Sequence, residues 1–345
     1  MNFLNQKTRI LNTKKELNWG ILGAGIIAHT MADALKNTPG NRLVAVASKT
    51  TARAQTFAAK HGVPHAYDYQ HLLDSTEVDV VYVATTHNFH YQNARLALEH
   101  GKHVLVEKPF TVNADEAQKL VELARARKLF LMEAIWTRFL PVMKMLKRNI
   151  ADGEIGQVRQ MTISFGGFVS PEYKERLTNP ALAGGVTLDM GIYPISFACY
   201  LLGELPVEIR SMAQMSAGGV DELASYMFRF PSGCLVSIST SFNLKMTNEA
   251  IIYGAEGYIV FPEFAAGQGF TTYKHEGTNT ISDETVFNEN RPYHGFEYQL
   301  AEVAHCIKSG ALESKIIRLD ETIAIMQVMD NMRQDWGLVY PFEKS

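Results

Sequence analysis

The stretch WGILGAGIIAHTMADAL, residues 19–35, sets the fold of the first third of the chain. An apolar run is followed at once by Gly23, Gly25 and Ala28, at the spacing G-x-G-x-x-[GA], and then by residues of helical period. The first glycine permits a tight turn, the second lets the backbone approach a pyrophosphate, and the small third residue allows close helix packing. The stretch predicts the strand, turn and helix of a nucleotide-binding fold, and a glycine-rich turn without a ligand is the alternative.

Short apolar runs alternate with segments of helical period from Asn18 to Ile135. This alternation is typical of βαβ units that build a parallel sheet. The strands are expected at 19–22, 42–47, 78–85, 103–106 and 130–134, and the helices at 26–37, 52–60, 89–100 and 114–128. The sequence therefore predicts a Rossmann doubly wound parallel sheet over residues 17–135, preceded by an N-terminal extension over residues 1–16.

The pattern changes after Trp136. Segments such as QVRQMTISFGG, residues 157–167, and VEIRSMAQMSA, residues 207–217, alternate with period two, and tight turns separate such segments. Helical periodicity returns in four places, with helices expected at 141–149, 190–202, 298–308 and 320–336. Residues 136–345 are therefore predicted to form an α+β domain for substrate binding and oligomerisation, with an open, mostly antiparallel sheet and helices on one face.

The composition excludes several classes of function. The chain has 345 residues, of which 46% are hydrophobic, and a formal net charge of -3. Its length favours two domains, and its weak charge gives no general attraction to nucleic acid or anionic membranes. No segment is expected to span a membrane. The three cysteines show no CxxC spacing, so neither a disulfide framework nor a metal site is predicted, and a cytoplasmic location is favoured.

The second strand is expected to end within VAVASKTTAR, residues 44–53. An Asp or Glu at the end of this strand would bind both hydroxyls of an NAD ribose. Here the position holds Ser48, which does not repel a 2′-phosphate, and Lys49 and Arg53 follow with positive charge. These residues predict a site for NADP(H), with a solvated basic loop as the alternative.

The segment VATTHNFH, residues 83–90, is expected at the carboxyl edge of the sheet, beside the crevice where such folds bind ligands. Its polar residues are predicted to line the nicotinamide side, although Asn88 is equally suited to cap the next helix. The predicted cofactor contacts are Gly23, Gly25, Ile26, Ile27, Ser48, Lys49, Arg53, Thr85, Thr86, Asn88, Glu107 and Lys108.

Two further segments carry the candidate catalytic residues. HVLVEKPF, residues 103–110, ends a strand with Lys108, which is costly to bury without a partner or a task. AGGVTLDMGIYP, residues 183–194, places Asp189 and Tyr193 four residues apart, on one face of a helix. A surface lysine, an N-cap aspartate and a core tyrosine are the alternatives. Together the three predict proton transfer, because a neighbouring ammonium favours the phenolate and brings the pKa of the phenol toward that of a usable acid or base.

Three motifs in order, G-A-G-x-x-A, HVLVEKP and A-G-G-x-x-x-D-x-G-x-Y-P, resemble the glucose-fructose oxidoreductase / inositol dehydrogenase / MocA family of NAD(P)-dependent oxidoreductases. Within it, FLMEAIWTRFLP and the tyrosine at 193 resemble the dimeric trans-1,2-dihydrobenzene-1,2-diol dehydrogenases, which are NADP-dependent. The resemblance implies that Lys108 and Tyr193 carry the proton transfer, that Asp189 helps to hold substrate, and that Lys108–Pro109 is a cis peptide. It also implies a substrate pocket bordered by Trp136, Arg138 and an aromatic residue, Phe165 or Phe168.

The sequence thus predicts an NADP(H)-dependent oxidoreductase that interconverts CH–OH and C=O on a cyclic polyol, a sugar or a trans-dihydrodiol. A non-catalytic NADP-sensing regulator on the same fold is the alternative, and it would not need Lys108, Asp189 and Tyr193 together. An antiparallel sheet with helices on one face leaves the other face to be covered, which predicts at least a homodimer through that sheet. Neither nucleic acid nor a membrane is expected as a partner.

Overall fold

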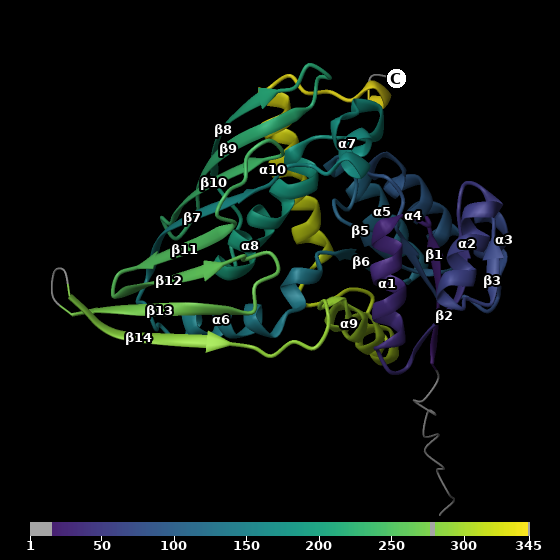
Figure 1. Ribbon diagram of the computed structural model, residues 1–345, viewed down its shortest axis with the longest axis horizontal. Helices are drawn as coiled ribbons and strands as arrows, with labels where there is room; N and C mark the ends of the chain where they lie inside the picture. The colour runs from purple at the N-terminus through teal and green to yellow at the C-terminus, as the bar shows by residue number, and fades with distance from the viewer. Residues whose placement is uncertain (1–15, 277–279, 344–345) are drawn as a thin grey trace, which may run out of the picture.

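The computed structural model describes residues 16–276 and 280–343, and these residues form two sheets with helices around them (Figure 1). The predicted extension over residues 1–16 lies outside the described residues, except for Glu16. The division at residues 135 and 136 stays a prediction. The two sheets fall on either side of it, since the first ends at Ala134 and the second begins at Val158.

The first sheet is parallel, has six strands and runs in the order β3-β2-β1-β4-β5-β6. Its strands are β1 (Leu17–Leu22), β2 (Asn41–Ala47), β3 (His65–Tyr67), β4 (Val80–Val83), β5 (His103–Glu107) and β6 (Leu131–Ala134). The helices between them are α1 (Ile26–Lys36), α2 (Thr51–His61), α3 (Tyr69–Asp74), α4 (His90–Glu99) and α5 (Ala114–Arg127). The predicted doubly wound sheet is confirmed. The first strands extend from β1 toward one edge and β4 to β6 toward the other, so the strand order reverses between β1 and β4. The carboxyl ends of these two strands therefore form the ligand-binding crevice.

The second sheet has eight strands in the order β14-β13-β12-β11-β7-β10-β9-β8. All neighbours in it are antiparallel except β7 and β10. The strands are β7 (Val158–Gly166), β8 (Glu208–Met215), β9 (Asp221–Arg229), β10 (Leu235–Ser241), β11 (Glu249–Gly254), β12 (Gly257–Pro262), β13 (Gly269–Glu276) and β14 (Thr280–Asn288). The α-helices in this part are α6 (Pro141–Ala151), α7 (Pro171–Thr178), α8 (Ile192–Leu202), α9 (Phe296–Ser309) and α10 (Leu319–Asp335).

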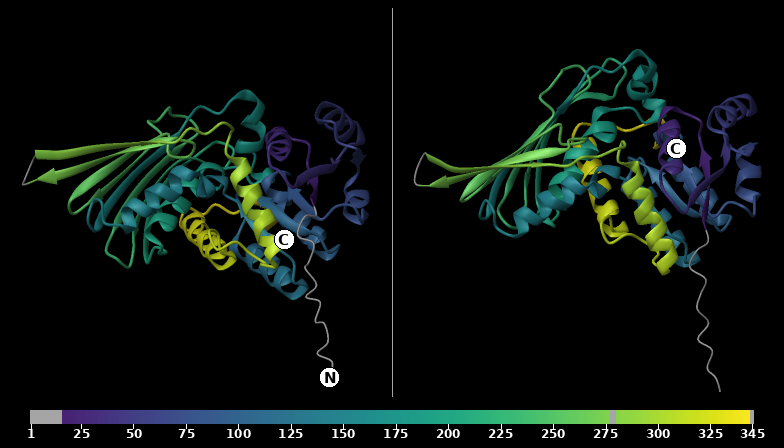
Figure 2. Two further views of the ribbon diagram at one scale, coloured as in Figure 1. Left: turned by 90° about the horizontal axis from the view of Figure 1, so that it is seen from below. Right: turned by 60° about the horizontal axis from the view of Figure 1, so that its bottom comes forward.

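Helices cover one face of the second sheet and leave the other open (Figure 2). The alternation along β9 shows the consequence, because Tyr226 and Phe228 are buried under the helices whereas Met227 is 53% exposed on the open face. Met212 on β8 is 79% exposed. The predicted open, mostly antiparallel sheet with helices on one face is therefore confirmed.

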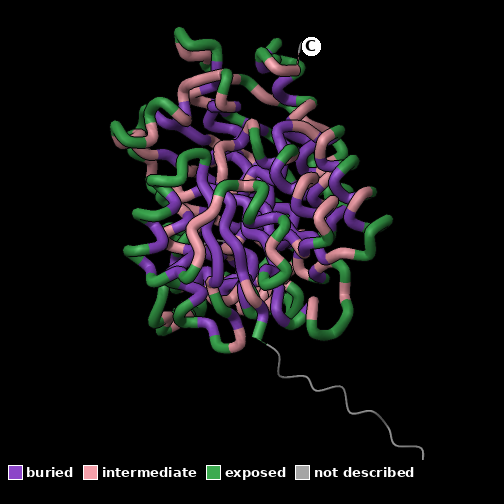
Figure 3. The backbone as a smooth tube through the Cα atoms, turned by 90° about the vertical axis from the view of Figure 1, so that its right-hand side faces the viewer, coloured by how far each residue is buried: buried purple, intermediate pink, exposed green. Residues whose placement is uncertain are grey.

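The last two helices return to the parallel sheet, where α9 lies beside α1 and α10 beside α5 (Figure 1). The apolar side of α10, formed by Ile325, Met326, Met329 and Met332, is buried, as expected for a core-packing stripe. Figure 3 shows the buried backbone in the middle of the molecule and the exposed turns at its edge. The three cysteines are free and buried.

One segment has the length and the apolar composition of a membrane-spanning helix. The segment Pro180–Leu202 is largely helical, with a break at residues 183–185, and only its length and composition match such a helix. However, 83% of that window is buried inside the protein. The segment includes α8, which lies under the second sheet, and its apolarity is that of a core helix.

Candidate active site

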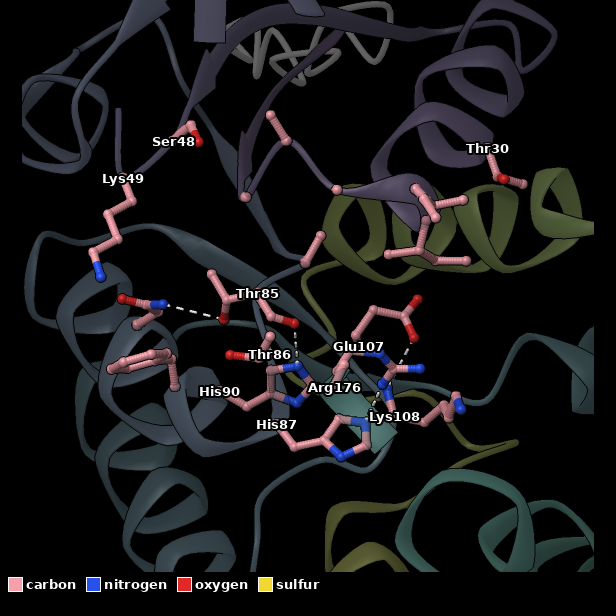
Figure 4. A pocket seen from close by; sticks show the side chains of 18 of the residues that line it. Thr30, Ser48, Lys49, Thr85, Thr86, His87, His90, Glu107, Lys108 and Arg176 are labelled. Carbon is pink, nitrogen blue, oxygen red and sulfur yellow. Dashed lines mark hydrogen bonds between the residues drawn. The ribbon is translucent and has the colours of Figure 1, made fainter. Parts of the chain in front are cut away.

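A cleft of about 830 Å³ lies at the carboxyl ends of the parallel strands and extends to α7 and α8. This volume is within the range of small-molecule and cofactor sites. Figure 4 shows Ser48 and Lys49 at one end of it and His87, Lys108 and Arg176 at the other. Predicted residues that line it are Gly23, Gly25, Ile26, Ile27, Ser48, Lys49, Arg53, Thr85, Thr86, Glu107, Lys108, Asp189 and Tyr193.

The glycine turn leaves room for a phosphate group above the start of α1. Gly23 has φ +104°, and an added Cβ would lie 2.5 Å from the carbonyl oxygen of Ala84, so a larger residue does not fit. An added Cβ on Gly25 would meet nothing within 4 Å, which leaves the space above it open. No side chain caps α1, and its first turn has no acidic residue, so its free N–H groups suit an anion. Ile26 is 48% exposed at this point.

The Ser48 end of the cleft carries positive charge. Ser48 is buried at the end of β2, and Lys49 and Arg53 follow it as exposed side chains. Tyr69 from α3 lines the same end and offers an aromatic ring. Among the described residues that line the cleft, the carboxylates are Glu107, Glu172 and Asp189, none of them on β2 or α2.

The other end brings together residues that lie 81 positions apart in the sequence. The Lys108 ammonium lies 2.6 Å from the Asp189 carbonyl oxygen and 3.0 Å from its carboxylate oxygen Oδ1. The same Nζ is 5.0 Å from the centre of the Tyr193 ring. The Lys108–Pro109 bond is cis, as the resemblance implied. A π-helical turn over Thr187–Gly191 precedes α8, and both Asp189 and Tyr193 line the cleft.

Local charges keep Asp189 and Lys108 ionised. Burial alone would raise the pKa of Asp189, but the charges of Lys108 and Arg176 outweigh it and lower the pKa well below its usual value. Burial likewise opposes the charged form of Lys108, but Asp189 and Tyr193 outweigh it and raise the pKa of the lysine. Both groups are therefore charged at neutral pH, and together they form an ion pair at the end of the cleft.

The pKa of Tyr193 does not move in the direction that the sequence suggested. Burial raises it, and although Lys108 lowers it as expected, that charge does not outweigh the burial and the neighbouring Glu107. The neighbouring Trp136 side chain also favours the phenolate, without reversing the shift. Tyr193 is therefore a protonated phenol at neutral pH, a state suited to giving a proton to an oxygen in the cleft.

Buried carboxylates fix the backbone around Lys108. Glu107 accepts a short hydrogen bond from the Tyr82 hydroxyl, and its other oxygen lies 3.1 Å from the Lys108 amide nitrogen. Glu133, at the end of β6, accepts a hydrogen bond of 3.0 Å from the amide of Phe110. The lysine thus projects from a turn that is held on both sides.

Two of the predicted residues lie away from the cleft. Asn88 lines a separate groove, where its amide donates to the carbonyl of Ala181 at 3.1 Å, and it caps no helix. Arg138 is 2% exposed, and its guanidinium binds Ser196 and the Glu321 carboxylate, the latter at 2.8 Å. The prediction that Arg138 borders the substrate pocket is therefore wrong, because its N–H groups join α8 to α10 instead.

The predicted aromatic residues also lie outside the lining. Phe168 is 76% exposed on the loop after β7. Phe165 packs edge-on against Tyr193, with ring centres 5.8 Å apart, and so supports the phenol from behind. Trp136 packs on Phe296 at 5.2 Å, and it is Phe296 that faces the cleft. The aromatic side of the cleft is thus formed by Phe296 and by Tyr173 from α7.

Sequence reasoning missed Arg176, Tyr173, Phe296 and Tyr69. The first two lie on α7, an eight-residue helix of low apolar content, and no periodicity indicated it. Phe296 starts α9 after Gly295, which has φ +108°. The glycine before an aromatic residue in RPYHGFEYQL was the one available signal for it, and Tyr69 had none.

The cleft combines a dinucleotide-binding crevice with an ion pair and a phenol at its other end. An NAD(P)-dependent oxidoreductase of CH–OH groups requires these parts. The comparison with known families agrees. Residues 17–135 match the oxidoreductase family with an NAD-binding Rossmann fold, and residues 143–260 match the GFO/IDH/MocA C-terminal domain. The chain belongs to this Gfo/Idh/MocA family and is an NAD(P)-dependent oxidoreductase acting on CH–OH donors.

Its relatives include two kinds of dehydrogenase. A trans-1,2-dihydrobenzene-1,2-diol dehydrogenase of Danio rerio is 34% identical over 331 residues, which cover 94% of this chain and 98% of that protein. A D-xylose 1-dehydrogenase (NADP(+)) of Hypocrea jecorina is 35% identical, over 94% of this chain and 93% of that protein. A solved 3-ketoreductase from Actinomadura kijaniata, in complex with NADP and TDP-benzene, shares the fold at a TM-score of 0.83 and 23% identity, covering 93% of this chain and 98% of that one.

Proposed function

We propose that the protein is an NADP(H)-dependent oxidoreductase that interconverts CH–OH and C=O on a cyclic polyol, a sugar or a trans-dihydrodiol. The observation that carries the proposal is the meeting of Lys108, Asp189 and Tyr193 in one cleft with the glycine turn. The relatives named above act, by their names, on a dihydrodiol and on a sugar. A cytoplasmic location remains a prediction from the composition.

When bound, an NADP(H) molecule held by the glycine turn and the Ser48 end of the cleft would supply a hydride to a carbonyl carbon in reduction, or accept one in oxidation. Tyr193 gives its hydroxyl proton to the carbonyl oxygen, so that a C–H and an O–H bond form while the C=O double bond becomes single. Lys108 stabilises the phenolate that remains, until a proton from solvent restores the phenol. Oxidation follows the same path in reverse, with the phenolate of Tyr193 accepting the hydroxyl proton of the substrate.

A preference for NADP(H) is supported by the charge at the Ser48 end. A 2′-phosphate there would meet the exposed Lys49 and Arg53 without a carboxylate from β2. Charge-assisted hydrogen bonds to phosphate are the strong kind, and removing one costs roughly 1.5–3 kcal/mol. We therefore expect NADPH to bind at least tenfold more tightly than NADH.

The proposed function is tested by following NADPH oxidation at 340 nm with a panel of aldoses, osones, cyclic ketones and dicarbonyls, and NADP⁺ reduction with the matching polyols and dihydrodiols. Turnover of at least one panel member, with a higher kcat/KM for NADPH than for NADH, is the expected result. Tight NADPH binding without any turnover would instead support the alternative, a sensor of NADP. Higher turnover with NADH would contradict the interpretation of Ser48.

Assembly through the open face of the second sheet is the second part of the proposal. Met212, Met227 and Leu235 are exposed there, on the side opposite the helices. Contact between two such faces would bury these residues in a symmetric interface. We therefore expect a homodimer or a higher homo-oligomer in solution.

A further inference from the structure

Arg176 joins the candidate active site from α7, and the proposed mechanism gives it no task. Its two terminal nitrogens lie 3.2 and 3.1 Å from Asp189 Oδ1, and Nη1 is also 2.9 Å from His87 Nε2. The side chain lines the cleft near Lys108 (Figure 4). It is 29% exposed, more than the 14% of Lys108. It is thus a second cation beside the reacting groups.

The hydrogen bonds fix the roles of the groups around this arginine. His87 Nε2 accepts from Arg176, so its Nδ1 carries the proton and donates to the carbonyl of Ala183 at 3.0 Å. Burial lowers the pKa of His87, in keeping with a neutral ring. Arg176 is therefore held between a neutral imidazole from the loop after β4 and the Asp189 carboxylate at the start of α8.

Among the described residues, only one oxygen of the Asp189 carboxylate, Oδ1, accepts hydrogen bonds. Lys108 and both terminal nitrogens of Arg176 donate to Oδ1, and no hydrogen bond among the described residues reaches Oδ2. The Asp189 side chain is 11% exposed and lines the cleft. A guanidinium has five N–H groups, and three of those of Arg176 are used, so Nε–H and one N–H of Nη2 have no hydrogen-bond partner in the part of the chain that the structure describes. The pair therefore offers the cleft both an acceptor and a donor.

We propose that Arg176 is a specificity-determining residue that, with Asp189 Oδ2, binds the substrate oxygen on the carbon next to the reacting one. A hydroxyl at that position can donate to the carboxylate and accept from the guanidinium at once. Lys108 and Arg176 share one carboxylate oxygen, so their donor nitrogens lie no more than about two hydrogen-bond lengths apart and can contact neighbouring oxygens of one substrate. The substrate class is then vicinal diols in oxidation and α-hydroxycarbonyl compounds in reduction, and this inference rests on the proposed function.

The test compares two oxidation probes, trans-cyclohexane-1,2-diol and cyclohexanol, which differ by the neighbouring hydroxyl. The variant Arg176→Gln removes the charge, Arg176→Lys keeps it without the fork of donors, and Lys174→Gln on the same helix is the control, because Lys174 is exposed and does not line the cleft. The ratio of kcat/KM values for the two probes is measured for each protein, together with the NADPH dissociation constant.

We expect the wild type to prefer the diol, and Arg176→Gln to reduce that preference by about tenfold or more, the loss of one charge-assisted hydrogen bond. The ratio for Arg176→Lys should lie between those of the wild type and Arg176→Gln, and the ratio for Lys174→Gln should equal that of the wild type. The NADPH dissociation constants of all these proteins should agree within about twofold. An unchanged ratio in Arg176→Gln, or an equal loss on both probes, would overturn the inference. If Arg176→Gln does not bind NADPH, the ratio for Arg176→Lys decides in the same way.

A wild type that binds NADPH but oxidises neither these probes nor any member of the wider panel would overturn the proposed function, and this inference with it. A wild type that oxidises both probes without preference would overturn the inference alone. The two failures are therefore distinguishable.

Discussion

Glu133 connects the Lys108 turn to the rest of the protein, and its substitution gives a measurable prediction. The carboxylate lies at the end of β6, is 2% exposed, and accepts hydrogen bonds from the Phe110 amide at 3.0 Å and from the Thr322 hydroxyl at 3.2 Å. Burial raises its pKa from 4.5 to about 7, and Phe110, Arg138 and Thr322 offset only part of that effect. The folded protein therefore binds this proton more tightly than the unfolded chain does.

The sign and size of the effect follow from linkage. A carboxyl whose pKa is raised on folding contributes fully below its unfolded pKa of 4.5, and this contribution is lost as the pH rises to about 7. At about 1.4 kcal/mol per pH unit, Glu133 should lower the free energy of unfolding by about 3 kcal/mol over that interval. Gln at this position accepts from Phe110 through its oxygen and donates to Thr322 through its amide, without titrating.

We therefore expect Glu133→Gln and the wild type to be equally stable near pH 4.5, and the variant to be more stable by up to about 3 kcal/mol near pH 8. Urea unfolding at several pH values, followed by circular dichroism, measures the difference between the two proteins, which isolates this one group. Parallel pH profiles for the two proteins would refute the reasoning. Glu133→Ala, which leaves the Phe110 amide unsatisfied, should be less stable at every pH.

Three further predictions concern the cofactor and the assembly. Lys49→Ala should weaken NADPH binding by about tenfold and leave NADH binding unchanged in fluorescence titrations, because only the 2′-phosphate meets this charge, and equal losses for both cofactors would argue against it. Gly23→Ala should lower both NADPH affinity and the melting temperature, since its Cβ would collide with the Ala84 carbonyl at positive φ, and an unaltered protein would show that the turn is less tight than described. Met227→Glu, on the open sheet face, should convert the assembly to monomers in sedimentation experiments without loss of NADPH binding, and an unchanged mass would place the interface elsewhere.

The parallel sheet could be predicted from the sequence because its strands are buried on both sides. The strands β1, β2, β4 and β5 each contain a buried, mostly apolar run, and the glycine turn marks the first strand and helix. β3 has only three residues, all half-buried, and α3 has only six, so both are too short to show a hydrophobic periodicity in the sequence. In the second sheet, β14 is mostly exposed and does not alternate, which hides it in the same way.

The residues of the candidate site that directly follow a strand could be predicted from the sequence. Lys108, Ser48 and Thr85 each follow a buried strand, and the carboxyl ends of parallel strands meet at one edge. Positions on loops and short helices could not, because their place depends on tertiary contacts. Arg138 and Arg176 show the difference, since only the packing of α7, α8 and α10 decides which of these two arginines reaches the cleft.

The central claim is that Tyr193 provides the proton in a reaction carried out with NADP(H) in this cleft, and Tyr193→Phe tests it most directly. Phe keeps the ring and its edge-on contact with Phe165 but removes the hydroxyl. Single-turnover NADPH oxidation, with a carbonyl substrate found in the panel, should be at least about a hundredfold slower in the variant, while NADPH binds as in the wild type. A variant that turns over at the wild-type rate would contradict the account.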